Sequence, residues 1–199
     1  MNNLYEPRNS VYCYPNSEVL VNKFDVKSWT ELFKIENDIT IYKLYMLREQ
    51  GITGNFDVAH FVSIHKFLFE DIYPFAGLYR NENIAKDNFM FANWEFIEEN
   101  MNMIFNELKS ENYLEGLEKA KLAERLSYYM ADLNVLHPFR EGNGRTTREF
   151  IRQLALRNGY NLDLSKFAAK DILRASIESV VDMNKLQGII YTALIEVEE

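Results

Sequence analysis

The positions of apolar residues predict helices along most of this chain. The first run begins after Ser28, and its apolar side chains recur every three or four residues, the period of an amphipathic helix. These side chains are Leu32, Ile35, Ile39, Tyr42 and Tyr45. Ser28 and Glu31 have the spacing of a capping box, which predicts that the helix starts at Ser28. The glycines of GITGN, residues 51–55, predict its end.

Further helices are predicted in the middle of the chain. The segment VAHFVSIHKFLFEDI, after Asp57, is apolar on most sides, so we expect it at the centre of the core. Asn93 is the expected N-cap of a helix over 94–110. A long helix that starts near residue 117 should end just before Pro138, because a proline disfavours helical geometry at the preceding residue. Its apolar stripe contains Leu122, Leu126, Tyr129, Met130, Leu133 and Leu136.

The remaining segments predict a mainly α-helical protein with one β-hairpin. A helix that begins at 143–145 should stop at Gly159, because glycine adopts the left-handed conformation that ends helices. Two more helical segments are predicted, over about 166–181 and 183–197. Residues 1–27 have the pattern of an irregular arm, and two short runs around AKDN, within 78–92, predict the hairpin.

Composition indicates a globular protein and argues against several kinds of partner. Hydrophobic residues make up 47% of the 199, enough for a buried core, while 8 glycines and 4 prolines do not favour a turn-rich β architecture. A formal net charge of −8 argues against direct binding to nucleic acid or to an anionic membrane. No apolar run approaches the roughly 18–20 residues of a membrane span, and no secretory signal is visible. Since the one cysteine, Cys13, cannot form an internal disulfide, we expect a cytoplasmic protein.

The stretch HPFREGNGRTTR contains the candidate chemistry. Arg145 and Arg148 lie in the first turns of a predicted helix, where the helix dipole favours acidic residues. A strongly anionic ligand at this N-terminus would explain both arginines. Gly142 and Gly144 would let the backbone approach such a ligand closely. Over 135–157 five arginines outnumber two glutamates, a focal basic patch that suits a small polyphosphate better than a nucleic acid.

Glu141 and His137 add a candidate metal ligand and a candidate base. A carboxylate repels phosphates unless a cation lies between them, and Mg²⁺ typically binds one or two carboxylates plus substrate phosphates. His137 is the side chain in this stretch suited to accepting a proton near neutral pH. Taken singly, these features fit a turn, a helix connection or a solvated arginine face better than a functional site. Their combination within twelve residues favours phosphoryl or nucleotidyl transfer.

Residues 137–148 match HxFx(D/E)GNGRxxR, the signature of the Fic family, at every fixed position. The segments YCYPNSEVLVNK, IHKFLFEDIYPFAG and NIAK also resemble this family, so the resemblance covers nearly the whole chain. It implies a single Fic domain over 1–199. In this fold an α-helical bundle carries an irregular arm, here 1–27, and a β-hairpin flap, here 78–92, beside the active-site loop.

The resemblance also implies a reaction. Members of the family transfer AMP from ATP to a Tyr, Ser or Thr hydroxyl of a target protein and release pyrophosphate. By this resemblance His137 would be the general base, Phe139 a buried anchor of the loop, and Glu141 the ligand of Mg²⁺.

Further roles follow from the same resemblance. The phosphate-binding residues would be Gly142, Asn143, Gly144, Arg145 and Arg148. Among them Asn143 would contact the α-phosphate, Arg145 the β-phosphate and Arg148 the γ-phosphate. In the flap, which would add the target's backbone as a strand, Ile84 and Lys86 would clamp the modified side chain.

Two alternatives to adenylylation stay open at this point. The related Doc toxins phosphorylate their target and have Lys where Gly144 stands, and other family members transfer other nucleotides. A nucleotide-binding module without turnover is a further alternative, which the presence of His137 and Asn143 disfavours. His60 and His65 are five positions apart and are expected to pack in the structure rather than bind a metal.

Regulation and partners are implied only by the resemblance. Family members are commonly inhibited by a helix with [S/T]xxxE[G/N], whose Glu pairs with the second motif arginine, here Arg148. Two incomplete copies contain Glu36 and Glu196, and both fit a core helix at least as well. The expected inhibitor is therefore a separate small antitoxin-like protein, unless the chain is unrestrained. The resemblance implies as target an ATP-binding subunit of a type II topoisomerase, although host-directed relatives modify small GTPases.

Overall fold

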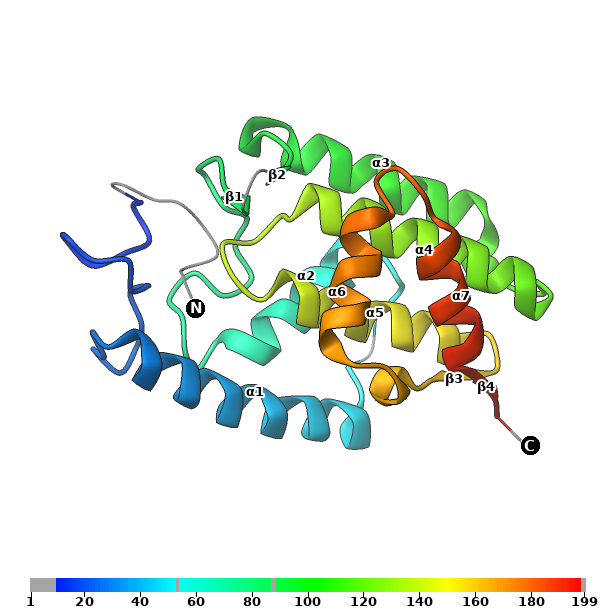
Figure 1. The fold of residues 1–199 in the computed structure, drawn as a ribbon, viewed down its shortest axis with the longest axis horizontal. Coiled ribbons are helices and arrows are strands. Elements are labelled where there is room, and N and C mark those ends of the chain that lie inside the picture. The colour runs from blue at the N-terminus through cyan, green and yellow to red at the C-terminus, as the bar shows by residue number, and fades with distance from the viewer. Residues whose placement is uncertain (1–9, 53, 87–88, 198–199) are drawn as a thin grey trace.

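The computed structural model describes residues 10–52, 54–86 and 89–197 and confirms a mainly α-helical architecture (Figure 1). The α-helices are α1 (Trp29–Gln50), α2 (Val58–Phe69), α3 (Ile97–Ser110), α4 (Lys119–Leu136), α5 (Asn143–Arg157), α6 (Ala169–Glu178) and α7 (Asn184–Ala193). Short 3-10 turns are η1 (Trp94–Phe96), η2 (Asn112–Leu114) and η3 (Leu164–Lys166). The strands are β1 (Ala85–Lys86), β2 (Phe89–Met90), β3 (Tyr160–Leu162) and β4 (Leu194–Glu196).

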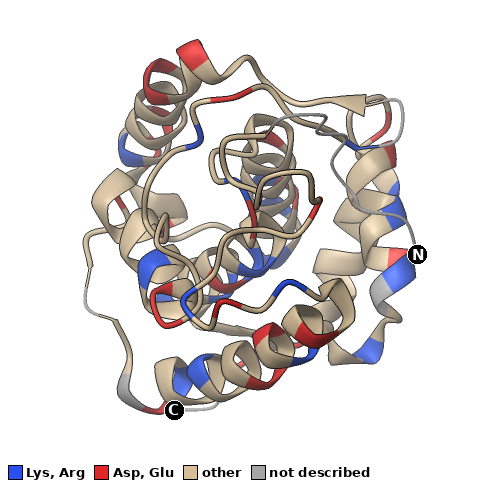
Figure 2. Ribbon diagram, turned by 90° about the vertical axis from the view of Figure 1, so that its left-hand side faces the viewer, with Lys and Arg blue, Asp and Glu red and all other residues tan. Residues whose placement is uncertain are grey.

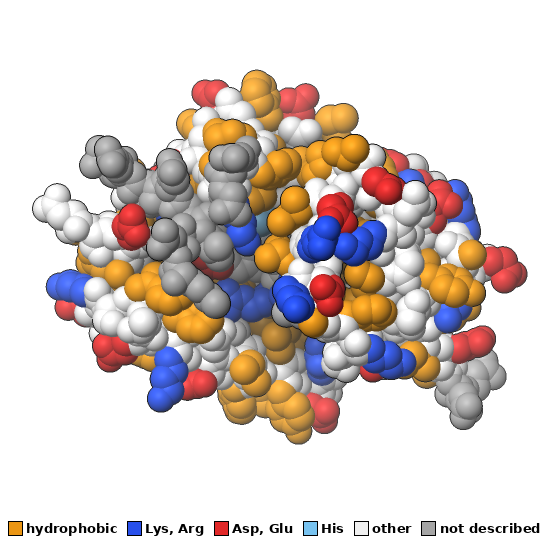
Figure 3. All heavy atoms as spheres, viewed as in Figure 1, with side chains coloured by type: hydrophobic (Ala, Val, Ile, Leu, Met, Phe, Trp, Pro, Cys, Tyr) orange, Lys and Arg blue, Asp and Glu red, His pale blue; other side chains and the backbone are white. Residues whose placement is uncertain are grey.

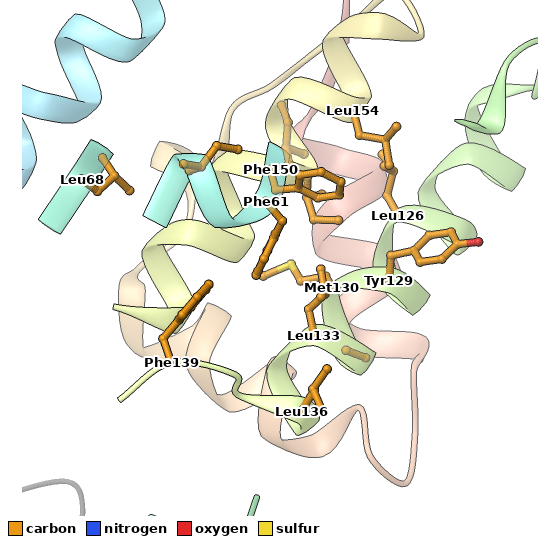
Figure 4. Close-up of a cluster of buried hydrophobic side chains, with 14 of the residues drawn as sticks. Phe61, Leu68, Leu126, Tyr129, Met130, Leu133, Leu136, Phe139, Phe150 and Leu154 are labelled. Carbon is orange, nitrogen blue, oxygen red and sulfur yellow. The ribbon is translucent and has the colours of Figure 1, made fainter. Parts of the chain in front are cut away.

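Helices α2, α4 and α5 form the centre of the core (Figure 4). Phe61 of α2 and Phe150 of α5 meet edge to face, with ring centroids 5.5 Å apart, and Met130 of α4 lies beside them. The whole stripe predicted for α4 is buried, as expected. Since burying one such side chain contributes about 1.5–3 kcal/mol, this cluster fixes the relative positions of the helices that carry the motif.

Local sequence signals set the helix boundaries as predicted. The side chains of Ser28, Asp57 and Asn93 each accept a hydrogen bond from a backbone N–H of the following turn. Gly51 follows α1 with a positive φ of 71°. His137 ends α4 in the left-handed conformation, with φ 48°. Acidic and basic residues are spread over most helices, as Figure 2 shows, and among the described residues no helix is long and apolar enough to cross a membrane.

The predicted hairpin is present and is tied to the end of α4. Strands β1 and β2 pair antiparallel, with Ala85 opposite Met90, so the first two residues of AKDN belong to β1. Residues 87–88, the rest of AKDN, lie outside the described residues. The Ala92 N–H donates to the Val135 carbonyl of α4 at 3.2 Å. The hairpin therefore lies against the loop that follows α4.

The C-terminal part differs from the prediction. Helices α6 and α7 are shorter than expected, and residues 194–196 form β4 instead of continuing a helix. Strand β4 pairs with β3, with Glu196 opposite Tyr160 and Leu162 opposite Leu194. This second two-stranded sheet was not predicted. It closes the bundle beside the end of α5.

The apolar stripe predicted for α1 is only partly correct. Leu32 is buried, but Tyr42 and Tyr45 are 60% and 59% exposed. The buried face instead includes two polar side chains, Glu36 and Thr40. The predicted irregular arm is confirmed over 10–27, and its first nine residues lie outside the described part of the chain.

Candidate active site

The left-handed turn at the end of α4 presents the His137 imidazole to a cavity. Nδ1 lies 3.0 Å from the Asn134 carbonyl oxygen, which can only accept, so Nδ1 carries the proton and donates. Nε2 is then the ring nitrogen that can accept a proton. This tautomer is the one that a general base at this position requires.

The hairpin and a buried arginine hold this histidine in place. The Phe91 ring stacks on the imidazole, with centroids 3.8 Å apart and an interplanar angle of 20°. The buried Arg80 guanidinium donates to the His137 carbonyl at 2.8 Å and to the Ala92 carbonyl. Burial, and then the positive charges of Arg80 and Lys86, lower the pKa of His137 to about 3. The base is therefore neutral at physiological pH.

Phe139 lies buried at the base of the motif loop. Its ring is fully buried and stacks on His65 at 3.7 Å. The Asn143 amide brackets its backbone, accepting from the Phe139 N–H at 2.8 Å and donating to the Phe139 carbonyl at 2.7 Å. The observed role of the Asn143 side chain is thus to close the loop.

His65 also holds this loop, a role that the sequence did not reveal. It packs in the core as expected, and its Nδ1 accepts from the Gly77 N–H at 2.8 Å. The other nitrogen, Nε2, must then carry the proton and donates to the Glu141 carbonyl at 2.9 Å. Burial lowers the pKa of His65 to about 4, so this pattern is stable at neutral pH.

The N-terminus of helix α5 has backbone geometry that favours an anion. Gly142 precedes it with φ 82°, and a Cβ there would lie 2.3 Å from the Phe69 ring, so only glycine fits. The first helical hydrogen bond runs from the Thr146 N–H to the Gly142 carbonyl. The N–H groups of residues 143–145 precede that bond and have no acceptor within the helix. Together with the helix dipole they favour an anion.

Arg145 extends from the first turn of α5 into a buried group of acids. Its guanidinium pairs with Glu36 of α1 at 2.5 Å and lies 3.4 Å from Glu141. The sequence-based hypothesis that an inhibitory Glu36 would pair with Arg148 is therefore wrong in its partner. Glu196, the other candidate, lies exposed on strand β4 and not on a helix.

Arg148 is a cation without a paired acid. Among the described residues no carboxylate lies within ion-pair distance of it, and burial followed by the charge of Arg145 lowers its pKa. Its Nη1 is 3.1 Å from where a Cβ on Gly144 would lie, so the two residues are in close contact. Two like charges in one pocket favour a multiply charged anion.

These groups converge on one cavity of about 540 Å³. It is lined by Lys86, Phe89, Phe91, Asn134, Val135, His137, residues 141–145, Arg148 and five residues of 172–180. Figure 3 shows Lys and Arg side chains and part of a His side chain in a hollow between apolar side chains. Lys86 of the flap lines this cavity, whereas Ile84 is buried and does not. A smaller cavity of about 260 Å³ shares Arg145 and Arg148 with it.

Glu141 fits the binding of one Mg²⁺ ion together with a polyphosphate. Its carboxylate lies beside the anion site of α5, and its Oε1 accepts from the Gly142 N–H at 2.8 Å. Burial, and then the charge of Glu36, raise the pKa of Glu141. Within the described residues no three potential metal ligands cluster.

Comparison with known proteins places this site in a family. The family model described as Fic/DOC family matches residues 55–155. A protein of Bartonella schoenbuchensis, protein adenylyltransferase VbhT, is 42% identical over 175 residues. The chain therefore belongs to the Fic/DOC family.

Relatives and solved structures extend this assignment to most of the chain. The match to VbhT covers 88% of this chain but only 37% of that protein. A Sinorhizobium fredii protein, named probable protein adenylyltransferase y4lH, is 36% identical over 84% of this chain and 86% of its own length. The N-terminal Fic domain of a VirB-translocated effector of Bartonella quintana, solved with bound ADP, superimposes with a TM-score of 0.87 at 26% identity, covering 94% of this chain and 95% of that one.

Proposed function

We propose that this chain is a protein adenylyltransferase, which transfers AMP from ATP to a Tyr, Ser or Thr hydroxyl of a target protein. The observation that supports this most directly is that His137, with Nε2 as its accepting nitrogen, shares one cavity with the N-terminus of α5 and with Arg145 and Arg148. A base and a polyphosphate site are thus adjacent. Adenylyl transfer is also the activity for which the curated relatives are named.

In this proposal His137 Nε2 takes the proton of the target hydroxyl as its oxygen attacks the α-phosphorus. The bond from that phosphorus to the oxygen bridging to the β-phosphate breaks, and pyrophosphate leaves. The backbone of Gly142, Asn143 and Gly144 binds the α-phosphate region. Arg145 then holds the β-phosphate and Arg148 the γ-phosphate. Glu141 would hold Mg²⁺, which would supply positive charge against the phosphates.

The flap is proposed to present the target. Its short strands leave an edge to which an extended target segment can add. Lys86 lines the cavity beside His137 and can contact the modified side chain. Ile84, the other residue expected in this clamp, is 4% exposed, so its part in the clamp would require the flap to move.

The unpaired Arg148 supports a separate inhibitor. It lines the smaller cavity, together with Arg48 of α1 and Arg152 of α5, both of which pair with Glu149. Arg148 is therefore the cation of this cavity to which a carboxylate of a small antitoxin-like protein would bind. We place the reaction in the cytoplasm, where ATP and Mg²⁺ are available. The expected target is an ATP-binding subunit of a type II topoisomerase.

We infer that residues 1–199 form one Fic domain, because the hydrophobic core extends beyond 55–155 on both sides.

The test is the intact mass of the chain, and of a purified topoisomerase ATP-binding subunit, after incubation with ATP and Mg²⁺. The wild type is compared with His137→Ala. A gain of one AMP on either protein, seen only with the wild type, supports the proposal. A phosphate-sized gain would indicate a Doc-like phosphotransferase instead. ATP binding without any gain on either protein would contradict the proposed reaction on this target.

A further inference from the structure

Glu36 lies on the face of α1 that packs against the core, an unusual position for a carboxylate. It is 7% exposed, and α1 lies along one edge of the molecule (Figure 1). One carboxylate oxygen, Oε1, accepts from Arg145 Nη2, and the other accepts from the Tyr73 hydroxyl. Since a buried charge is costly unless it is paired and hydrogen-bonded, this arrangement requires both partners.

Thr40, one turn further along α1, completes the arrangement. Its hydroxyl donates to the Glu36 carbonyl at 2.7 Å, and its oxygen accepts from Arg145 Nη1 at 3.3 Å. Arg145 therefore has both terminal nitrogens directed to α1, and its guanidinium lies over the Phe69 ring at 4.8 Å. Three helices, α1, α2 and α5, meet at this one guanidinium.

Glu36 and Glu141 compete for the same nitrogen of Arg145. Nη2 is 2.5 Å from Glu36 and 3.4 Å from Glu141, so the shorter and stronger ion pair is the one with Glu36. If the charge of Glu36 were absent, Glu141, which is already within ion-pair distance of Arg145, would be the one acid left beside this guanidinium among the described residues. A shorter ion pair there would occupy the carboxylate that suits a divalent cation.

We propose that Glu36 is a positioning residue, which draws the Arg145 guanidinium towards α1 so that its contact with Glu141 stays the longer of the two, and which thereby keeps the Glu141 carboxylate available to a cation. This rests on the proposed function of the site. It differs from an inhibitory role, in which Glu36 would compete with the phosphates and its loss would increase activity.

The test is ATP binding by calorimetry, in EDTA and in excess Mg²⁺, for the wild type and Glu36→Gln. Glutamine keeps the shape and can still accept from Tyr73, but it loses the charge. We expect the Kd for ATP in Mg²⁺ to rise about tenfold or more, the worth of one hydrogen bond to a charged group. The factor by which Mg²⁺ tightens ATP binding, the Kd in EDTA divided by the Kd in Mg²⁺, should also shrink, because Arg145 then pairs with the Glu141 carboxylate.

Two further variants keep the test decisive. Glu49→Gln removes an exposed acid of the same helix and should leave both Kd values unchanged. If Glu36→Gln does not fold, Tyr73→Phe weakens the support of Glu36 and should shift both Kd values in the same direction by a smaller factor. Two results would overturn this inference but not the proposed function. One is that Glu36→Gln and Tyr73→Phe both bind ATP with the Kd values of the wild type. The other is that Glu36→Gln transfers AMP faster than the wild type. A wild type that binds no ATP would overturn the proposed function as well.

Discussion

At the scale of single residues, the protonation state of His137 follows from its surroundings. A general base must be deprotonated to accept a proton. With a histidine of ordinary pKa, the rate of the catalysed step would fall about tenfold for each pH unit below about 6.5. Because burial and two nearby cations lower the pKa of His137 to about 3, its unprotonated form persists well below that pH. We expect kcat/KM for AMP transfer, which reports the free enzyme, to show no loss from this group between about pH 8 and 5. A tenfold loss per unit that starts near 6.5 in the folded enzyme would contradict this assignment.

Gly142 gives a second prediction at this scale. In Gly142→Ala, the new Cβ would meet the Phe69 ring in a backbone conformation with φ 82°. Strain and overpacking together should lower the free energy of unfolding by about 2–4 kcal/mol and abolish ATP binding. Gly116→Ala is the matched control, since its φ is 78° but nothing lies within 4 Å of the new Cβ. Chemical unfolding of both variants should show that the control loses only about 1 kcal/mol in its free energy of unfolding. Equal losses in the two variants would contradict the steric argument.

The sequence could predict the roles of contiguous residues but not their distant partners. Residues 137–148 identify a base, an acid and an anion site because their spacing alone brings them together. Glu36 is 109 positions from Arg145, and helical periodicity counts a glutamate as a solvent-facing residue. His65 likewise has the pattern of a core histidine, and only the fold shows that it donates to the Glu141 carbonyl.

At the scale of elements, the hairpin and the motif loop are one unit. The Phe91 ring covers one face of His137, and Arg80 donates to carbonyls on both segments. In Phe91→Leu we expect kcat to fall roughly tenfold, because the His137 ring is no longer held in position. The acid limb of the pH profile should move to higher pH, because water then reaches the imidazole. The KM for ATP should change little.

Two variants separate this coupling from a general effect of the flap. Phe91→Trp retains a stacking ring and should keep the wild-type pH profile. Phe89→Leu alters a neighbour that also lines the cavity but whose ring contacts Phe91 and not His137. If Phe89→Leu shifts the pH profile as much as Phe91→Leu does, stacking on the base is not the cause.

The elements that could be predicted have local signals, and the sheet that was missed has none. Capping side chains and glycines set the boundaries of α1, α2 and α5. Strands β3 and β4 are separated by α6 and α7, and Leu194-Ile195-Glu196 continues an apolar pattern that fits a helix. Only pairing with residues 160–162 makes this segment extended, and such pairing is decided by tertiary contacts.

At the scale of the whole molecule, the three histidines of the chain act on stability in the same sense. Burial is the main cause that lowers the pKa of His60, of His65 to about 4, and of His137 to about 3. In the unfolded chain each titrates near its ordinary value of about 6.5. As the pH falls below that value, the unfolded state takes up protons that the folded state does not, so the free energy of unfolding must fall.

The size of this effect can be measured against a single replacement. Each histidine contributes at most about 1.4 kcal/mol per pH unit between its unfolded and folded pKa values. In His65→Gln, the free energy of unfolding from urea titrations should be lower at pH 7, because the contacts with Gly77 and Glu141 are weakened, but its decline from about pH 6.5 to 4.5 should be shallower by up to that slope. Glu141, whose raised pKa acts in the opposite sense, is present in both proteins and largely cancels in the comparison. Parallel declines would mean that His65 is not held neutral by the fold, and the tautomer that supports the motif loop would then need revision.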